Sequence, residues 1–293
     1  MLYFVFCSFH CELLLLHVTL HQMHLWVKVL FDVKGTGLQM GDTVLCEWGQ
    51  GYCIIALYHH PNKYITKLKI YSLDPLSPMT EINEVIAAVK GFQTSPERFV
   101  FCSAFPEAVL TPQQLSNGAD KINASFFPPN IDVLQDRIGE WQLTNNYSFP
   151  AAISKALAEN FPKAFYYHCY TTALKIYNGV EEATQLQVHF IQKQFRVIVK
   201  KSGKLEAAQL YKYNTPLDVI YYLLKITEKL SLVKEETVVV LSGLIDEDSP
   251  LYKEIFQYFR NIQFVRPQAV TMEKDDHPAH FFSSMFNLAA CVS

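Results

Sequence analysis

The sequence predicts an α/β protein built from two similar halves, each with a mixed sheet, a three-strand antiparallel meander and flanking helices. Short runs of β-branched and aromatic residues alternate with helical patterns. The order of three strands, a helix and a strand occurs twice. In both copies the helix begins at a cap followed by proline, Ser77-Pro78 and Thr215-Pro216. We interpret the repeated order as an internal duplication, with coincidence as the alternative.

The first copy begins after Gly41. Its four expected strands are Thr43–Glu47, Tyr52–His59, Tyr64–Leu73 and Arg98–Phe105. The first two are joined by a tight hairpin at Trp48-Gly49-Gln50-Gly51. The helix after Ser77-Pro78 has an apolar stripe and ends at Gly91.

The second copy repeats this order. Its expected strands are Leu186–Ile191, Phe195–Lys200, Leu205–Tyr213, Thr237–Leu241 and a short Gln263–Arg266. Asp218, three residues after Thr215, can bond back to the cap of the first helix, and Ser249-Pro250 starts another. Between the copies we expect helices over Thr111–Phe127, Ala151–Asn160 and Thr171–Glu182, and strands over Ile138–Asn145 and Phe165–Tyr170. A short amphipathic helix should close the chain after His280.

The first 31 residues are apolar but contain Glu12 and four histidines. The uninterrupted run Leu13–Leu16 is short for a membrane span, and no Lys or Arg precedes Lys28, as a signal peptide would require. A metal site is one reading of the helical spacing of His17, His21 and His24 downstream of Cys7 and Cys11. A poorly ordered extension and a membrane anchor are the alternatives, and the extension is the interpretation that we prefer.

Composition narrows the function classes. The net charge is −3, so no basic surplus exists to neutralise phosphates, and we expect no nucleic-acid partner. The seven cysteines are scattered without CxxC spacing, which is typical of reduced thiols in the cytoplasm. Membrane association is not expected.

Four stretches of the chain carry a family resemblance: Phe105-Pro106-Glu107-Ala108-Val109-Leu110-Thr111-Pro112, Tyr213-Asn214-Thr215-Pro216, Leu241-Ser242-Gly243 with Asp248-Ser249-Pro250-Leu251, and His280-Phe281-Phe282. These motifs resemble those of the domain-of-unknown-function 3822 family. These are bacterial proteins with an actin-like fold and no assigned activity. The resemblance implies two actin-like (ribonuclease H-like) domains of the superfamily that includes sugar kinases and heat-shock chaperone ATPases. We therefore expect an atypical extension at 1–40, a first domain at 41–170 and a second at 171–293.

Superfamily members bind ATP with Mg²⁺ between the halves, through a glycine hairpin with an acidic residue in each half and a turn with two small residues. Here the resemblance assigns Glu47, Gly49 and Gly51 to the first hairpin and Ser242 and Gly243 to the small turn. The second hairpin, Ile191-Gln192-Lys193-Gln194-Phe195, has neither glycine nor carboxylate. Ordinary turn glycines and a capping serine are the alternative interpretation, which we favour.

Other chemistry finds less support. A ribonuclease H-like nuclease could use Glu47 with Glu81 or Glu84, but the fourth strand, Arg98–Phe105, supplies no carboxylate. GxxxxGK[ST], GxSxG and HExxH do not occur. We read His59-His60, His277 and His280 as solvated loop residues, and Cys46 and Cys53 as packed apolar residues.

The sequence thus predicts a non-catalytic actin-like module, without catalytic or metal residues, that acts through a protein partner or as a ligand-regulated scaffold. The alternative is a nucleotide-binding ATPase or kinase with a diverged site that takes ATP and Mg²⁺.

Overall fold

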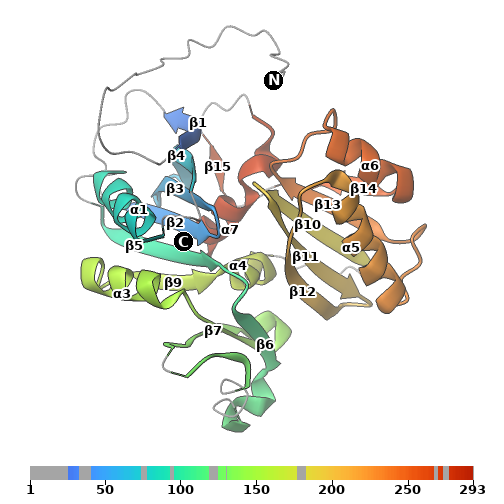
Figure 1. Cartoon of the computed structure of the whole chain (residues 1–293), viewed down its shortest axis with the longest axis horizontal. Helices are drawn as coiled ribbons and strands as arrows, with labels where there is room; N and C mark the ends of the chain where they lie inside the picture. Colours follow the sequence, from blue (N-terminus) through green and yellow to red (C-terminus); the bar gives the residue numbers. More distant parts are fainter. Residues whose placement is uncertain are drawn as a thin grey trace, which may run out of the picture.

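The computed structural model describes residues 26–32, 41–73, 78–92, 96–118, 125–129, 131–176, 183–266, 270–272 and 277–292. Two sheets lie side by side, and a smaller third sheet lies at one end of the molecule (Figure 1). Helices cover the outer faces of the two large sheets, and α7 enters the space between them.

The first large sheet has the strand order β1-β4-β3-β2-β5-β9, with β15 also paired to β4. Its strands are β1 (Trp26–Asp32), β2 (Asp42–Gly49), β3 (Tyr52–His59), β4 (Tyr64–Ser72), β5 (Arg98–Ala104), β9 (Phe165–His168) and β15 (Thr271–Met272). Helices α1 (Pro78–Phe92) and α3 (Ala151–Asn160) pack against each other beside it. Strand β1 lies within the expected extension, whereas residues 1–25, with the histidine and cysteine pattern, are outside the described residues.

The second sheet has the order β12-β11-β10-β13-β14. Its strands are β10 (Gln185–Ile191), β11 (Gln194–Lys201), β12 (Lys204–Lys212), β13 (Val238–Gly243) and β14 (Ile262–Phe264), with helices α5 (Pro216–Lys229) and α6 (Pro250–Tyr258). This order matches β4-β3-β2-β5-β9 strand for strand. In both sheets the meander is antiparallel and the last two strands pair in parallel. The duplicated α/β plan is therefore confirmed, and the division of the chain at residue 170 stays a prediction.

The helix caps explain where two of these helices begin. The Thr215 hydroxyl accepts from the backbone N–H of Asp218, whose carboxylate accepts from the N–H of Thr215, which is the expected capping box of α5. Ser249 caps α6 in the same way through the N–H of Tyr252. Ser77 lies outside the described residues.

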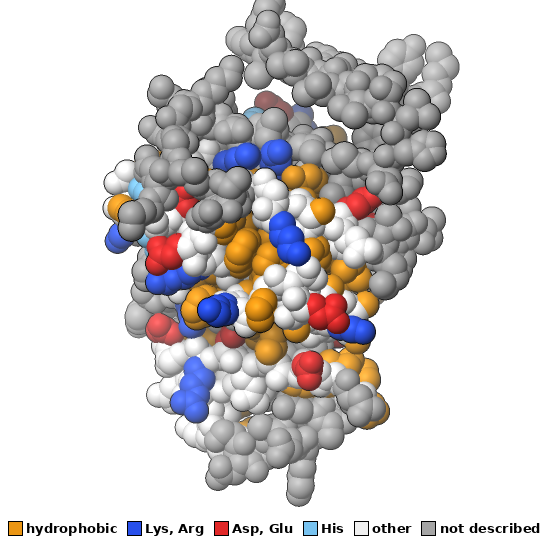
Figure 2. Space-filling model, turned by 90° about the vertical axis from the view of Figure 1, so that its left-hand side faces the viewer, with side chains coloured by type: hydrophobic (Ala, Val, Ile, Leu, Met, Phe, Trp, Pro, Cys, Tyr) orange, Lys and Arg blue, Asp and Glu red, His pale blue; other side chains and the backbone are white. Residues whose placement is uncertain are grey.

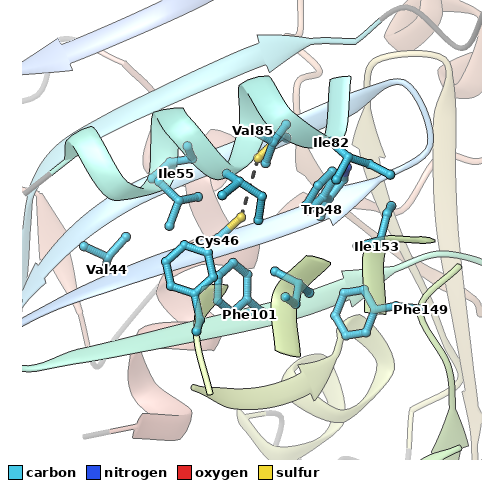
Figure 3. Close-up of a cluster of buried hydrophobic side chains, with 14 of the residues drawn as sticks. Val44, Cys46, Trp48, Ile55, Ile82, Val85, Phe101, Phe149 and Ile153 are labelled. Atoms are coloured by element: carbon cyan, nitrogen blue, oxygen red, sulfur yellow. Dashed lines mark hydrogen bonds between the residues drawn. The ribbon is translucent and has the colours of Figure 1, made fainter. Parts of the chain in front are cut away.

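Both faces of the first sheet are buried, which explains why its central strands are continuous apolar runs. On one face Trp48 and Phe101 pack against Val85 of α1 and Ile153 of α3 (Figure 3). On this face Cys46 and Cys53 lie with their sulfur atoms 3.5 Å apart and are packed as apolar residues, as expected. The surface of the molecule on the side that lies at the left of Figure 1 carries charges of both signs around scattered hydrophobic side chains (Figure 2).

The opposite face of the first sheet is covered by η3 (Ala279–Phe282) and α7 (Ser283–Val292), so the end of the chain returns to the first half. Helix α4 (Cys169–Ile176) packs against α7. As expected for neighbours on a strand, Tyr166 and Tyr167 point to opposite faces, each packing against a different core. None of the helices in the described part of the chain combines the length and the apolar character needed to cross a membrane.

The third sheet is an insert between β5 and α3, with strand order β6-β8-β7. It comprises β6 (Ala108–Pro112), η1 (Gln113–Gly118), β7 (Leu134–Ile138), η2 (Gly139–Trp141) and β8 (Leu143–Tyr147). Two expectations were wrong here. Thr111-Pro112 ends a strand instead of starting a helix, and the predicted strand Ile138–Asn145 is interrupted by a turn in which Gln142 has a φ of 51°. Helix α4 starts two residues earlier than expected, at Cys169, and its expected end at Glu182 lies outside the described residues.

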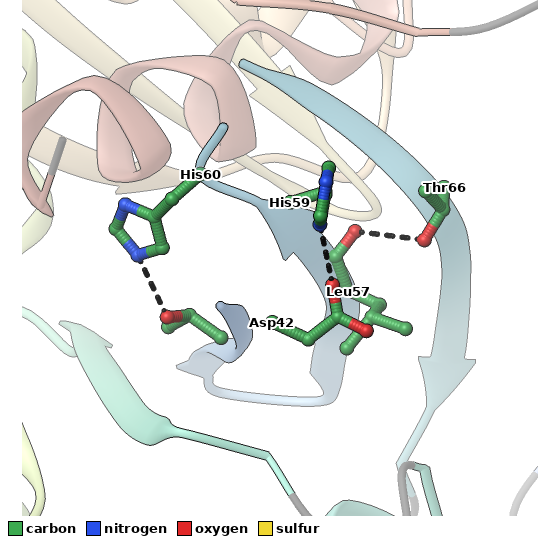
Figure 4. A network of polar contacts seen from close by, with 6 residues as sticks. Asp42, Leu57, His59, His60 and Thr66 are labelled. Carbon is green, nitrogen blue, oxygen red and sulfur yellow. Dashed lines mark hydrogen bonds and ion pairs between the residues drawn. The ribbon is translucent and has the colours of Figure 1, made fainter. Parts of the chain in front are cut away.

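The histidines at the far end of β3 are held in a polar network (Figure 4). His59 is 4% exposed and its Nδ1 lies 2.9 Å from Oδ1 of Asp42, so the expectation of a solvated loop histidine was wrong. Nε2 of His60 lies 2.8 Å from the Thr43 hydroxyl. His280 is likewise buried, and its Nε2 donates to the carbonyl of Ile245. These contacts give His59, His60 and His280 a structural role.

Candidate functional site

The first hairpin places Gly49 and Gly51 at the end of the β2–β3 ladder. Gly49 pairs with Tyr52, and Gly51 has a φ of +80°, the left-handed conformation that favours glycine in a tight turn. Gly49 is buried, and a Cβ placed on it would overlap the ring of Tyr52. The absent side chain of Gly49 therefore makes room for a tyrosine of the same hairpin.

Glu47 lies two residues before Gly49 and is 2% exposed. The Tyr52 hydroxyl donates to Oε1 of Glu47 at 2.9 Å. Burial raises the pKa of the Glu47 carboxyl. Four neighbours oppose this rise and lower the pKa: the charges of Arg196 and His168 and the hydroxyl groups of Tyr52 and Ser284. Oε1 of this carboxyl is thus bonded to Tyr52, whereas Oε2 has no hydrogen-bond partner among the described residues.

The second hairpin reaches across to the first. The Gln194 side-chain amide donates to the backbone carbonyl of Gln50, which joins the tips of the two hairpins. Two residues further along β11, the buried Arg196 donates from a terminal guanidinium nitrogen to the carbonyl of Cys169 at 2.9 Å. Gln194 of the second half therefore contacts the first hairpin, and Arg196 contacts the start of α4.

His189 occupies the position in the second half that Glu47 occupies in the first, two residues before the closing pair Ile191–Gln194. Its Nδ1 lies 3.0 Å from the Ser242 hydroxyl and 3.4 Å from the Ser283 hydroxyl. Burial, followed by the charge of Arg196, lowers the pKa of His189 well below its usual value. The ring is therefore neutral at physiological pH.

Ser242 and Gly243 end β13. Gly243 has a φ of +78°, and a Cβ there would overlap the carbonyl oxygen of Phe190, so strand β10 approaches this backbone closely. The carbonyl of Phe190 accepts from the N–H of Leu244 at 2.8 Å. Packing between two strands accounts for the glycine at this position.

The first turn of α7 lies between the two sets of predicted residues. Ser284 lowers the pKa of Glu47, and the Ser283 hydroxyl lies 3.4 Å from Nδ1 of His189, which in turn contacts Ser242. The structure thus brings Glu47, Gly49 and Gly51 together on one wall, and Ser242 and Gly243 on the other. The nucleotide-binding role of these five residues stays a prediction.

Sequence reasoning missed the residues that occupy this space: Tyr52, Gln194, Arg196, His189, Ser283 and Ser284. The sequence did hold a signal for His189, because His189 and Glu47 each lie two residues before the pair that closes their hairpin. Tyr52 read only as a strand aromatic, since the pattern does not show that its ring covers a glycine.

Two features oppose a magnesium-bound triphosphate in this arrangement. Tyr52 covers Gly49, where a backbone amide would approach a phosphate, and His189 stands where a second carboxylate would position the metal. Across the described residues, no three His, Cys, Asp or Glu side chains are grouped so that they could hold a metal ion.

Comparison with known families shows to which family the chain belongs. A family model described as "Protein of unknown function (DUF3822)" matches residues 100–262, more than half of the chain. The chain belongs to the DUF3822 family. The match spans β5, the insert, α4 and the second sheet as far as the start of β14, so the DUF3822 match includes both small-turn residues, Ser242 and Gly243. No curated protein sequence has a significant match to the chain.

Solved structures confirm the fold of this DUF3822 member. A Bacteroides thetaiotaomicron protein with an actin-like ATPase fold and unknown function superposes with a TM-score of 0.67 at 15% identity, covering 86% of this chain and 96% of that one. A structure of the PilM–PilN type IV pilus biogenesis complex matches with a TM-score of 0.55 at 12% identity, covering 85% of this chain and 98% of the matched one. At these identities the likeness concerns the fold alone.

Proposed function

We propose that the chain is a non-catalytic actin-like module that acts by binding a protein partner. The observation that carries the proposal is the closure of the cleft by the protein itself. The Tyr52 ring covers Gly49 and its hydroxyl binds Glu47. Gln194 joins the hairpins through Gln50. A phosphate would have to displace all of these groups.

The wall chemistry also supports the proposal. Nucleotide chemistry on this plan needs groups that position a metal from both halves. Glu47 is buried against a tyrosine, and its counterpart His189 is a neutral imidazole bonded to Ser242. Neither group belongs to a set of three His, Cys, Asp or Glu side chains in the described part of the chain, so the geometry favours binding over catalysis.

Binding a protein partner is the function that remains for this fold when its nucleotide chemistry is lost. The structure of the similar fold in PilM belongs to a complex with PilN, so this fold is compatible with a role as one member of an assembly. Exposed aromatic and aliphatic side chains on α5 and α6 offer contact area for such a partner: Leu217, Tyr221, Phe256 and Tyr258.

Calorimetric titration of the full chain with ATP and Mg²⁺ tests the proposal. We expect no binding heat with the wild-type chain. Micromolar binding by the wild type, lost when Gln192 and Lys193 in the second hairpin are both replaced by Ala, would overturn the proposal and support the diverged ATPase or kinase. Lys193 is exposed and Gln192 is half-buried in this turn, so circular dichroism of the paired variant accompanies the titration and establishes that it is folded.

Two further proposals accompany this function. We place the chain in the cytoplasm, supported by five free cysteines among the described residues: Cys46, Cys53, Cys102, Cys169 and Cys291. We also keep the domain division at 41–170 and 171–293, because each part contains one large sheet, with β15 (Thr271–Met272) joining the first sheet from the second part. Limited proteolysis tests the division, because two stable fragments that meet near residue 170 would support it and fragments that meet elsewhere would contradict it.

A further inference from the structure

The three-stranded insert is bonded to both halves of the molecule. It leaves the first sheet at the end of β5 and returns at α3. Two hydrogen bonds fasten its two ends to each other and to β5. The Ser148 N–H donates to the carbonyl of Glu107 at 3.1 Å, and the Ser103 hydroxyl donates to the carbonyl of Ser148 at 3.4 Å. The insert is therefore fixed to the first half at its base.

A buried carboxylate ties the insert to the start of α4. Asp136 on β7 accepts from the N–H of His168 at 3.1 Å and from the Tyr147 hydroxyl at 3.2 Å. His168 in turn donates from Nε2 to the carbonyl of Phe105 at 3.0 Å. The next residue, Cys169, accepts from Arg196 of the second sheet. Residues 168–169 thus receive contacts from all three sheets.

The far side of the insert packs on the second half. Trp141 donates from its indole N–H to the carbonyl of Leu174 on α4 at 3.1 Å. The ammonium group of Lys200 on β11 lies 4.8 Å from the centre of the Trp141 ring, within the range of a cation–π contact. Lys200 is 3% exposed, so this charge lies in a desolvated position where such contacts are strongest.

An apolar cluster completes this second attachment. Ile138 of the insert, Leu174 of α4 and Ile198 of β11 are each almost fully buried together. Half-buried neighbours from both sides pack around them: Leu110, Trp141, Leu143, Leu205 and Ala208. Separating the halves would expose this cluster to water, which opposes the motion.

We infer that the insert is a brace that holds the two sheets at one fixed angle, so the halves move as a single body. Its base is bonded to the first sheet, and its far side is bonded to α4 and β11. Domain closure of the hinge type needs a junction with few contacts. Here the junction is spanned by the insert, which suits a rigid binding surface better than a closing cleft.

Distance measurement by double electron–electron resonance tests the brace. Spin-labelled amino acids would replace the exposed residues Ala87 on α1 and Lys229 on α5, one in each half. We expect one narrow distance distribution for the full chain. Trp141→Ala should broaden it, because the variant loses the indole bond to Leu174 and the contact with Lys200. Trp141→Phe keeps a ring over Lys200 and should broaden it less.

A multimodal distribution in the wild type would overturn the brace, and so would an unchanged distribution in Trp141→Ala. Circular dichroism establishes that each variant is folded. If Trp141→Ala does not fold, Leu143→Ala removes part of the same cluster from the neighbouring strand and is expected to broaden the distribution. The smaller, surface-facing change Glu140→Ala is the matched control and should leave the distribution unchanged.

Discussion

Glu47 and His189 hold the same position in the two halves of the molecule. Each lies two residues before the pair that closes the first hairpin of its sheet, and each faces one serine of the first turn of α7. One side chain is a carboxyl and the other is a neutral imidazole. The duplication has therefore kept its strand order while the chemistry of the two cleft walls differs.

The bond between Tyr52 and Glu47 should contribute measurably to stability. Tyr52→Phe keeps the ring over Gly49 but removes the hydroxyl that donates to the buried carboxyl. We expect a loss of about 1–2 kcal/mol in the free energy of unfolding, measured by urea denaturation. Tyr166→Phe, at a half-buried ring whose pKa is raised by burial alone, is the control and should change stability less. Equal losses in the two variants would count against a specific role for the Tyr52 hydroxyl.

Gly243 should tolerate no side chain. In Gly243→Ala the new methyl group would overlap the carbonyl of Phe190 at a φ of +78°. We expect destabilisation on the order of 3 kcal/mol or more, seen as a lower thermal midpoint. Gly203→Ala has a similar φ of +71° but open space around it, so it isolates the backbone strain and should cost about 1 kcal/mol. Similar costs at the two positions would mean that β10 does not approach Gly243 closely.

His168 should make stability depend on pH. Burial lowers the pKa of this ring to about 4, whereas the unfolded ring keeps its usual value near 6.5. Between these values the unfolded chain binds the extra proton, so stability falls as the pH drops through this window. Burial raises the pKa values of Glu47 and Asp136, so their effect on stability has the opposite sign to that of His168. Their contribution to stability falls as the pH rises above the usual pKa range of carboxyl groups.

The His168 contribution can be separated by comparison with His168→Gln, whose amide can still donate to Phe105. The difference in unfolding free energy between wild type and variant should shrink by about 3 kcal/mol from pH 7 to pH 4. Urea denaturation at several pH values measures it. A difference that does not vary with pH would show that His168 is protonated equally in both states.

The buried pair of Asp42 and His59 should matter more than an exposed ion pair. Asp42→Ala removes a carboxylate bonded at 2.9 Å to a histidine that is 4% exposed. We expect a loss of about 2–3 kcal/mol in urea denaturation, because the buried imidazole loses this partner. Glu97→Ala, which breaks the exposed 3.6 Å pair with Arg98, should cost at most about 0.5 kcal/mol. The reverse order of effects would contradict the burial of His59.

Most of the two repeated units could be predicted from the sequence. The expected bounds Tyr52–His59 and Ala151–Asn160 agree with β3 and α3, because strong periodic patterns are bounded there by turn residues. The capping box at Thr215 was equally legible, since both its residues are local. Local signals therefore predicted the duplicated core.

The insert could not be predicted in the same way. Pro112 ends an edge strand, where the missing N–H costs no ladder bond, so the Thr-Pro signal does not mark a helix there. Gln142 turns the chain within an apparent strand at a φ that its residue type rarely adopts. The occupied cleft was missed because the contact of Gln194 with Gln50 joins residues far apart in the sequence.

The most direct measurement is a crystal structure of the full chain grown with Mg²⁺ and a non-hydrolysable ATP analogue. Our account predicts that the Tyr52 hydroxyl stays on Glu47, that Gln194 stays on Gln50, and that no nucleotide lies between the hairpins. Phosphates bound to the amides of Gly49 and Gly51, with the Tyr52 ring displaced, would contradict it.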